Sequence, residues 1–378
     1  MRVLYVAPDQ VVPGRTGGSV HVLEVARGLA ARGHEVHAVV HRNPGSPDRE
    51  DQDGVNWHRI DWSPPHRLFR FRARKAVAAI ARSVRPDVLI ERYYNFGGEG
   101  VRAAAGLDIP SLLEVNSPVV DHPGSLKGVL DGLTLVRPLK RYREALCRQA
   151  AALLAPIPEI VPAFARPKTV TVTWGANVDA FRPAADGGDR RSLGLPEGAT
   201  VVAFSGSFRP WHGVHVFEEA ARRLRRRSDV FFLLAGGRRA EPGRGFNGRH
   251  LGAVPYHSMP AVLAAADVGC APYDTARLRQ LRLGFYWSPL KVFEYMAAGL
   301  PTLTIPRFPL TEIVRDGLEG LHVREADPHA LAAAIERLAD DAPLRRRLGA
   351  QARERVVARY SWARHCEALE AVLLRVAR

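Results

Sequence analysis

The sequence RVLYVA at residues 2–7 is a short apolar run of the kind that forms a buried β-strand. A loop containing Gly17 and Gly18 follows it. Apolar residues at helical spacing then continue to Gly33, and a second strand is expected at 35–40. The chain therefore opens with a strand, a glycine-containing loop, a helix and a strand, which is typical of a parallel α/β domain.

The second half of the chain opens with the same succession. VVAFS at 201–205 predicts a strand, 206–213 a loop with glycines, 214–227 a helix and 230–234 another strand. Two such openings predict two Rossmann-like α/β domains that face each other across a cleft, joined near the proline-rich stretch 181–196. Ligands of such sheets bind at the carboxyl ends of the strands, so the active site is expected in that cleft. Further short strands are expected at 55–60, 88–90, 111–115, 169–172, 268–271, 302–305 and 321–323.

Composition narrows the class of protein. The 378 residues leave room for two cores, and 46% hydrophobic and 25% charged residues are ordinary for a globular chain. The formal charge of +15 is spread over both halves, and no nucleic-acid-binding signature appears, so no nucleic-acid partner is expected. No apolar run reaches the roughly 20 residues of a membrane span, and the first strand is too short for a signal peptide. We expect a cytoplasmic protein of undetermined oligomeric state.

Two clusters of basic and aromatic residues lie at 67–75 and 137–148. They could rest on an anionic membrane surface, which would place the protein at the inner face of the membrane. They could equally be solvated amphipathic helices. The three cysteines have no metal-ligand spacing, so neither a disulfide framework nor a metal site is expected.

SPLKVFEYMAAGLP at 288–301 reads as a loop entering a short helix. Ser288 is expected to cap the helix, and Gly299 to end it in a left-handed conformation. Lys291 places a cation in the first turn, where the helix dipole is already positive, and a docked anion would explain it. Glu294, one turn further on, could hold a neighbouring diol. A nucleotide-sugar offers both groups, although an ordinary capped helix with a solvated lysine and glutamate would fit the same spacing.

The chain resembles glycosyltransferases of the GT-B architecture, and among them glycosyltransferase family 4, over nearly its whole length. The motifs that carry the resemblance are GG at 17–18 with LAARGHEV at 29–36, GANVDAFRP at 175–183, FSGSFRPWHG at 204–213, SPLKVFEYMAAGLP at 288–301, EIV at 312–314 and DGLEG at 316–320. The resemblance implies an acceptor domain at 1–180 with a returning C-terminal helix at 359–378, and a donor domain at 183–358. It also implies a retaining, metal-independent transfer from a nucleoside diphosphate sugar, without a further cofactor.

Three positions depart from the family pattern. Tyr286 stands where the family usually has a first glutamate, as in the subgroup with serine–proline–leucine–lysine. Ser207 and His212 replace the arginine and lysine of the phosphate loop. Asn116 stands where a histidine is common, and an amide cannot act as a base.

The resemblance assigns site residues for both substrates. Arg209, His212 and Lys291 are expected to stabilise the leaving diphosphate; a protonated His212 would add charge, and a neutral one only a hydrogen bond. The residues expected at the donor are Gly17, Gly18, Gly206, Ser207, Tyr286, Ser288, Leu290, Lys291, Glu294 and Glu312. Those expected at the acceptor, unless they are turn-stabilising polar groups, are Tyr93, Asn95, Glu114, Asn116, Asp121 and His122.

The expected reaction moves a sugar from a UDP-sugar, or secondarily a GDP-sugar, to a hydroxyl of a natural product, a cell-envelope glycan or a lipid-linked glycan. Alternatives on the same fold are a nucleotide-sugar epimerase, a sugar phosphorylase and a non-catalytic nucleotide-sugar-binding protein. A dinucleotide oxidoreductase is disfavoured, because the spaced glycine fingerprint is missing after Val6.

Overall fold

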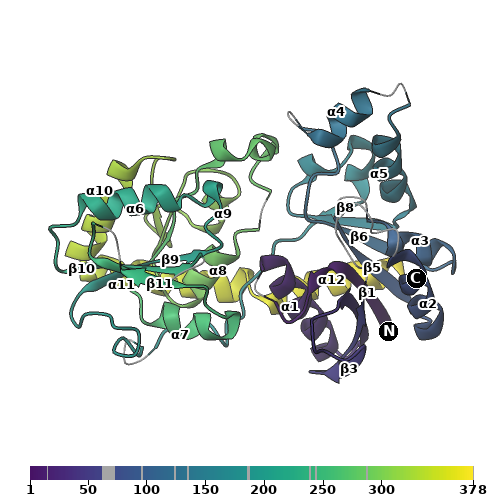
Figure 1. Ribbon diagram of the computed structural model, residues 1–378, viewed down its shortest axis with the longest axis horizontal. Helices are drawn as coiled ribbons and strands as arrows, with labels where there is room; N and C mark the ends of the chain where they lie inside the picture. The colour runs from purple at the N-terminus through teal and green to yellow at the C-terminus, as the bar shows by residue number, and fades with distance from the viewer. Residues whose placement is uncertain are drawn as a thin grey trace. The chain divides into compact units, whose positions relative to one another are not determined.

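The computed structural model describes residues 1–14, 16–61, 73–94, 97–122, 125–133, 136–184, 188–237, 240–242, 245–286 and 288–377. The chain divides into two compact units (Figure 1). The first contains residues 1–174, 286–288 and 362–378, and the second contains residues 175–285 and 289–361. The chain thus passes into the second unit at Gly175, before the proline-rich stretch at which the sequence placed the connection.

The first unit is built on an eight-stranded sheet in the order β3-β4-β2-β1-β5-β6-β7-β8. All neighbouring strands are parallel except the β3–β4 pair. The strands are β1 (Arg2–Val11), β2 (Glu35–His41), β3 (Arg49–Gln52), β4 (Val55–Ile60), β5 (Val88–Tyr93), β6 (Ser111–Val115), β7 (Ala152–Ala155) and β8 (Thr169–Thr171). The helices are α1 (Gly17–Ala31), α2 (Ala73–Val84), α3 (Glu99–Ala105), α4 (Leu126–Gly132), α5 (Pro138–Gln149) and α12 (Trp362–Val376).

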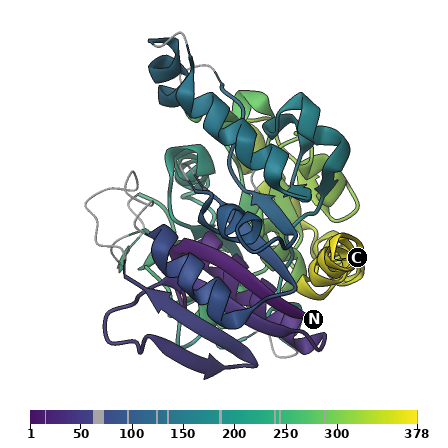
Figure 2. The ribbon, with the colours of Figure 1, turned by 90° about the vertical axis from the view of Figure 1, so that its right-hand side faces the viewer.

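Helix α12 completes the first unit from the far end of the chain. It packs against α1, and Figure 2 shows it in yellow beside the purple N-terminal segment. The close approach depends on Gly28, because a Cβ at this position would overlap the Cys366 sulfur. At the rim of the contact, the Glu370 carboxylate binds Arg32 and lies 2.9 Å from His34 Nε2. The sequence placed the start of this returning helix at residue 359, whereas residues 342–359 form the last helix of the second unit.

The second unit is built on a seven-stranded sheet in the order β11-β12-β10-β9-β13-β14-β15, with only the β11–β12 pair antiparallel among the described strands. The strands are β9 (Thr200–Gly206), β10 (Val230–Gly236), β11 (Ala240–Pro242), β12 (Gly248–Gly252), β13 (Val268–Ala271), β14 (Thr302–Thr304) and β15 (Gly320–His322). The helices are α6 (Val214–Arg223), α7 (Met259–Ala264), α8 (Leu290–Ala297), α9 (Leu310–Ile313), α10 (Pro328–Asp340) and α11 (Ala342–Arg359).

The ends of helix α8 correct one expectation and confirm another. Ser288 does not cap the helix: Pro289 stands at the N-cap without a side-chain bond, and the Ser288 hydroxyl accepts a hydrogen bond from the Trp174 N–H at 3.1 Å. Gly299 adopts the expected left-handed conformation, with φ +75°. A Cβ at Gly349 would overlap the Gly299 carbonyl, so the backbones of α11 and this turn meet directly.

Candidate active site

Lys291 lies in the first turn of α8, and its side chain is buried. Only 8% of the residue is exposed, so the solvated lysine allowed by the sequence is excluded. Its Nζ lies 4.3 Å from the centroid of the Phe204 ring and 5.7 Å from that of Tyr273. Among the residues that the structure describes, this ammonium group has no hydrogen-bond partner. A buried polar group without a partner is costly, and it marks a place where a ligand would supply the missing interaction.

Burial also changes the protonation of Lys291. Removal from water lowers the pKa of the ammonium group from 10.5 to about 7, although the negative charge of Glu294 opposes the shift. Close to half of the molecules would therefore carry a neutral lysine at pH 7. An anion bound beside Nζ would favour the charged form.

His212 ends a short turn after β9 (Pro210–His212) and is half-buried. Burial lowers the pKa of its imidazole to about 2, and the charges of Lys291 and Arg209 add to that shift. Of the two forms considered from the sequence, the neutral imidazole is therefore the one present. Its Nδ1 has no hydrogen-bond partner among the described residues, and its ring meets the edge of Trp211 with centroids 4.2 Å apart.

Gly206 brings these two side chains together. Its φ is +135°, and a Cβ added there would lie 2.9 Å from Lys291 Nζ and 3.5 Å from His212 Nδ1. The loop is held in place by a second glycine, because a Cβ at Gly213 would overlap the Pro272 carbonyl. The end of β9, the glycine loop and the start of α8 thus converge on one point.

Glu294 is buried as well, which excludes the solvated glutamate considered from the sequence. Its neighbour Tyr295 fixes the helix to the sheet: the Tyr295 hydroxyl accepts a 2.7 Å hydrogen bond from the Ser205 N–H at the end of β9. Helix α8 is therefore anchored to the strand whose loop carries Gly206.

The remaining donor-side residues of the second unit are more open. Ser207 and Arg209 are exposed in the glycine loop, although the charge of Arg209 reaches His212. Leu290 is half-buried at the first position of α8, where the backbone N–H has no acceptor within the helix. Glu312 is exposed in the short helix α9.

Four expected donor residues, Ser288 among them, belong to the first unit. Gly17 and Gly18 open α1, which is capped by the Thr16 hydroxyl at 3.2 Å from the Ser19 N–H. Tyr286 is buried in the short segment that groups with this unit.

Glu114, at the end of β6, is the centre of a buried polar network. Its carboxylate accepts hydrogen bonds from the Tyr5 hydroxyl at 2.6 Å and from Asn116 Nδ2 at 2.9 Å. His21 Nε2 lies 2.9 Å from the same carboxylate. Burial alone would raise the pKa of Glu114, but His21, Arg92 and the Tyr5 hydrogen bond together hold it well below its usual range. Glu114 is therefore ionised and neutralised by the protein itself.

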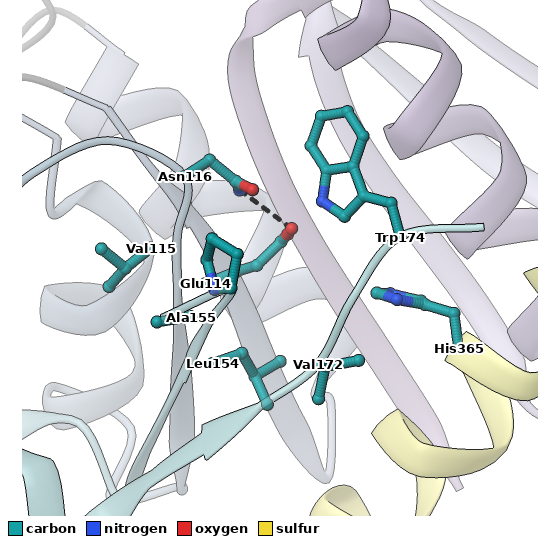
Figure 3. Close-up of a pocket in the computed structure, with 9 residues that line it drawn as sticks. Glu114, Val115, Asn116, Leu154, Ala155, Val172, Trp174 and His365 are labelled. Carbon is teal, nitrogen blue, oxygen red and sulfur yellow. Dashed lines mark hydrogen bonds between the residues drawn. The ribbon is translucent and has the colours of Figure 1, made fainter. Parts of the chain in front are cut away.

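A pocket opens beside this network (Figure 3). Asn116 and Glu114 lie on one side of it, and Trp174 and His365 on the other. Burial lowers the pKa of His365 to about 4, and its Nδ1 lies 2.8 Å from the Thr173 carbonyl. The neutral ring must donate from Nδ1 to that carbonyl, which leaves Nε2 as an acceptor. The pocket is lined by Glu114, Val115, Asn116, Leu154, Ala155, Pro156, Val172, Trp174 and His365.

Tyr93, Asp121 and His122, also expected at the acceptor, do not line this pocket. Tyr93 is buried at the end of β5. Asp121 binds Arg143 Nη2 at 2.8 Å, so it has the structural role that the sequence left open. His122 is half-buried. Asn95 lies outside the residues that the structure describes.

Sequence reasoning missed His21, Trp174 and His365. The rings of His21 and Trp174 stack with centroids 4.4 Å apart, and His365 meets His21 at 5.4 Å. These residues come from α1, the end of the first unit's main segment and α12, and no local motif links three such distant places.

Comparison with known proteins identifies the class. Sucrose-phosphate synthase from Thermosynechococcus elongatus has a TM-score of 0.75 and 20% identity, with 99% of this chain and 98% of that chain covered. HepE from Anabaena, solved with UDP-glucose, has a TM-score of 0.71 and 14% identity, with 99% and 100% covered. The fold is therefore the GT-B fold, with two Rossmann-like α/β domains.

The sequence comparisons add a match for each half of the chain. Residues 187–355 match the family described as glycosyl transferases group 1, and residues 16–171 match the glycosyl transferase 4-like domain. D-inositol 3-phosphate glycosyltransferase from Corynebacterium diphtheriae is 27% identical over 404 residues, covering 95% of this chain and 90% of the relative. The chain is thus similar to group 1 glycosyltransferases in one half and to glycosyl transferase 4-like domains in the other, and it is a glycosyltransferase enzyme. No helix in the described part of the chain has the length and hydrophobicity to span a bilayer.

Proposed function

We propose that the enzyme is a retaining, metal-independent glycosyltransferase that uses a nucleoside diphosphate sugar, with UDP favoured over GDP, and no further cofactor. The observation that carries the proposal is the buried ammonium group of Lys291, which lies beside Gly206 and His212 without a hydrogen-bond partner among the described residues. A diphosphate is the ligand that would supply both charge and acceptors at that point.

The donor would be held by α8 and the glycine loop. The first N–H groups of α8, at Leu290 and Lys291, point out of the helix and would bind phosphate oxygens. Gly206 leaves room for a phosphate to approach the backbone. Glu294 would accept hydrogen bonds from the ribose hydroxyls, as the family resemblance implies.

In the transfer, the bond between the sugar C1 and the diphosphate oxygen breaks, and the acceptor oxygen bonds to C1 on the same face. The acceptor proton passes to the departing phosphate oxygen, so no protein base is required. The main charge develops on the leaving diphosphate, where Lys291 would supply positive charge, helped by Arg209. Neutral His212 would contribute a hydrogen bond and no charge.

The acceptor would bind the pocket beside Glu114. The carboxylate and His365 Nε2 both accept hydrogen bonds, so the pocket suits a single hydroxyl group. The Corynebacterium relative is named for an inositol phosphate, but the described residues that line this pocket include no lysine or arginine to pair with a phosphate. We therefore expect a neutral hydroxyl of a natural product or of a cell-envelope or lipid-linked glycan to enter this pocket.

A thermal-shift screen with UDP, GDP and their sugar derivatives tests the proposal. A nucleotide at 100 times its Kd stabilises the protein by about 2.7 kcal/mol, which a melting curve resolves. The Lys291→Met variant should lose that shift. Absence of a shift with every nucleotide in the wild-type protein would contradict the donor site.

Turnover assays with labelled donors, EDTA and a panel of hydroxylic acceptors then separate the alternatives. Transfer in the presence of EDTA with retained anomeric configuration supports the proposal. Nucleotide binding without any turnover would favour a binding protein, and a changed free sugar without acceptor would favour an epimerase.

A further inference from the structure

Helix α4 and the residues after it expose an unusual cluster of large apolar side chains. The exposed fractions are 59% for Val129, 44% for Leu130, 79% for Leu133 and 55% for Val136. Nine large hydrophobic residues are exposed in the described part of the chain, and these four lie within eight positions of one another. Single exposed apolar residues need no explanation, but a cluster of this kind marks an interaction surface.

The cluster lies on α4 and just before α5, which pack against each other. The buried Asp131 carboxylate accepts hydrogen bonds from the N–H groups of Leu139 at 2.9 Å and Lys140 at 2.7 Å, which caps α5. Arg143, also buried, lies 3.5 Å from Asp131 and donates to the Val119 carbonyl. The two helices therefore bury an ion pair while leucine and valine are exposed, the reverse of the usual arrangement in water.

The exposed charges next to the cluster are positive. Arg137 and Arg141 are exposed at the start of α5, and neither forms an ion pair with any residue that the structure describes. The nearby Glu144 lies 3.9 Å from Lys140 Nζ and 3.3 Å from Arg148, so its charge is already compensated. In Figures 1 and 2, α4 lies beyond α5 at the outer end of the first unit, away from its sheet.

We propose that this surface (the α4 tip: Val129, Leu130, Leu133, Val136, Arg137 and Arg141) docks on an anionic lipid surface. Apolar side chains entering the headgroup region, with arginines beside them at the phosphates, are the combination that interfacial helices use. A nucleic acid would use the arginines and leave the leucine and valines exposed. The inference is independent of the donor chemistry, which takes place in the second unit.

Vesicle co-sedimentation of the full chain tests the docking. We expect the wild-type protein to sediment with phosphatidylcholine vesicles containing phosphatidylglycerol, and to stay in solution with phosphatidylcholine alone. Raising the salt concentration to 0.5 M shortens the Debye length to about 4–5 Å and should therefore weaken the binding. No sedimentation with anionic vesicles, or equal sedimentation with neutral ones, would overturn the proposal.

Two pairs of matched variants assign the binding to the α4 tip. Leu133→Asp/Val136→Asp should abolish sedimentation, while Val357→Asp/Leu374→Asp, which alters similarly exposed residues elsewhere, should not. Arg137→Gln/Arg141→Gln should weaken partitioning about thirtyfold, since each basic residue near the surface contributes about 1 kcal/mol. Arg226→Gln/Arg346→Gln makes the same change in net charge and should have little effect.

If the control variants lost as much vesicle binding as the α4-tip variants, the attraction between protein and lipid would be unspecific. That result would contradict the assignment. Light scattering tests the alternative that the α4 tip binds a second copy of the chain. A concentration-dependent dimer that Leu133→Asp/Val136→Asp dissociates would support this alternative and overturn lipid docking. All variants should keep the wild-type thermal shift with UDP, which shows that they are folded.

Discussion

The two units differ in how a buried charged side chain is compensated. In the first, the Glu114 carboxylate lies 2.9 Å from His21 Nε2 and accepts hydrogen bonds from Tyr5 and Asn116. In the second, Lys291 is equally buried, but its ammonium group has no hydrogen-bond partner among the described residues, and its pKa falls to about 7. The first charge contributes to the stability of the fold, whereas the second is left for a ligand to complete.

Removal of the satisfied charge should have the largest effect on stability. We expect Glu114→Ala to lower the free energy of unfolding by about 3 kcal/mol, because it leaves His21 and Tyr5 without their shared partner. Glu114→Gln keeps an acceptor for Tyr5 and should cost less. Urea denaturation monitored by tryptophan fluorescence measures both, and an unchanged midpoint for Glu114→Ala would contradict the role of the network.

Removal of the unsatisfied charge should affect activity and leave stability intact. We expect Lys291→Met to lower kcat about 100- to 1,000-fold, the usual effect of losing one stabilising group in the transition state. Its unfolding free energy should not fall, because an unpaired buried ammonium is replaced by an apolar chain. Lys168→Met is the matched control: Lys168 donates a hydrogen bond to the Arg148 carbonyl at 3.0 Å, so this variant should lose stability and keep its kcat.

The response to pH should also differ between the two regions. The pKa of Lys291 is about 7 in the folded protein and 10.5 unfolded, so the unfolded chain binds the extra proton and stability from this group rises with pH between these values. The low pKa of Glu114 gives stability that is present above pH 4.5 and is lost on acidification. Melting curves recorded at a series of pH values should show both effects: a loss of stability on acidification below pH 4.5 and a rise in stability with pH above 7. Lys291→Met should remove only the rise above pH 7.

Donor binding should follow the same linkage. A bound diphosphate favours charged Lys291, so UDP binding above pH 7 should take up a proton, and its Kd should rise by up to tenfold per pH unit. Calorimetry in buffers of different ionisation enthalpy counts the proton. A Kd independent of pH between 7 and 9 would place the diphosphate away from Lys291.

The smallest effect is expected at the entrance to α8. Ser288→Ala removes the hydrogen bond from the Trp174 N–H and should cost about 1 kcal/mol of stability. Because Ser288 does not cap the helix, nucleotide affinity should stay within about twofold of wild type, as measured by calorimetry. If Ser288→Ala lost as much nucleotide affinity as Lys291→Met, that result would support the capping role predicted from the sequence.

Sequence reasoning succeeded where the information was local. The two strand–loop–helix openings and the left-handed Gly299 follow from residue types at fixed spacing. The family resemblance named Gly206, His212 and Lys291, which the structure places side by side. The burial of Lys291 was not predictable from its helix, because Phe204 and Tyr273, which cover it, come from β9 and from the loop after β13.

The same limit applies to the first unit. Glu114 and Asn116 were found from their place after a strand. His21, which lies against Glu114, and His365, which lines the pocket, come from two helices far apart in the sequence. The cap at Ser288 failed because a tertiary partner, the Trp174 N–H, binds the hydroxyl that local chemistry assigns to the helix. The roles of Glu294 and Arg209 in donor binding remain predictions.

The contact between α1 and α12 has a consequence for biosynthesis. Gly28 leaves the space that Cys366 fills, so the first helix waits for a segment that is translated after the second unit. The second unit has been translated in full by then, since its final residue is Ser361. The second unit can therefore finish folding before the first, although the first begins to be synthesised earlier. Ribosome-bound chains stalled before residue 362 should contain a folded second unit and an incomplete first unit.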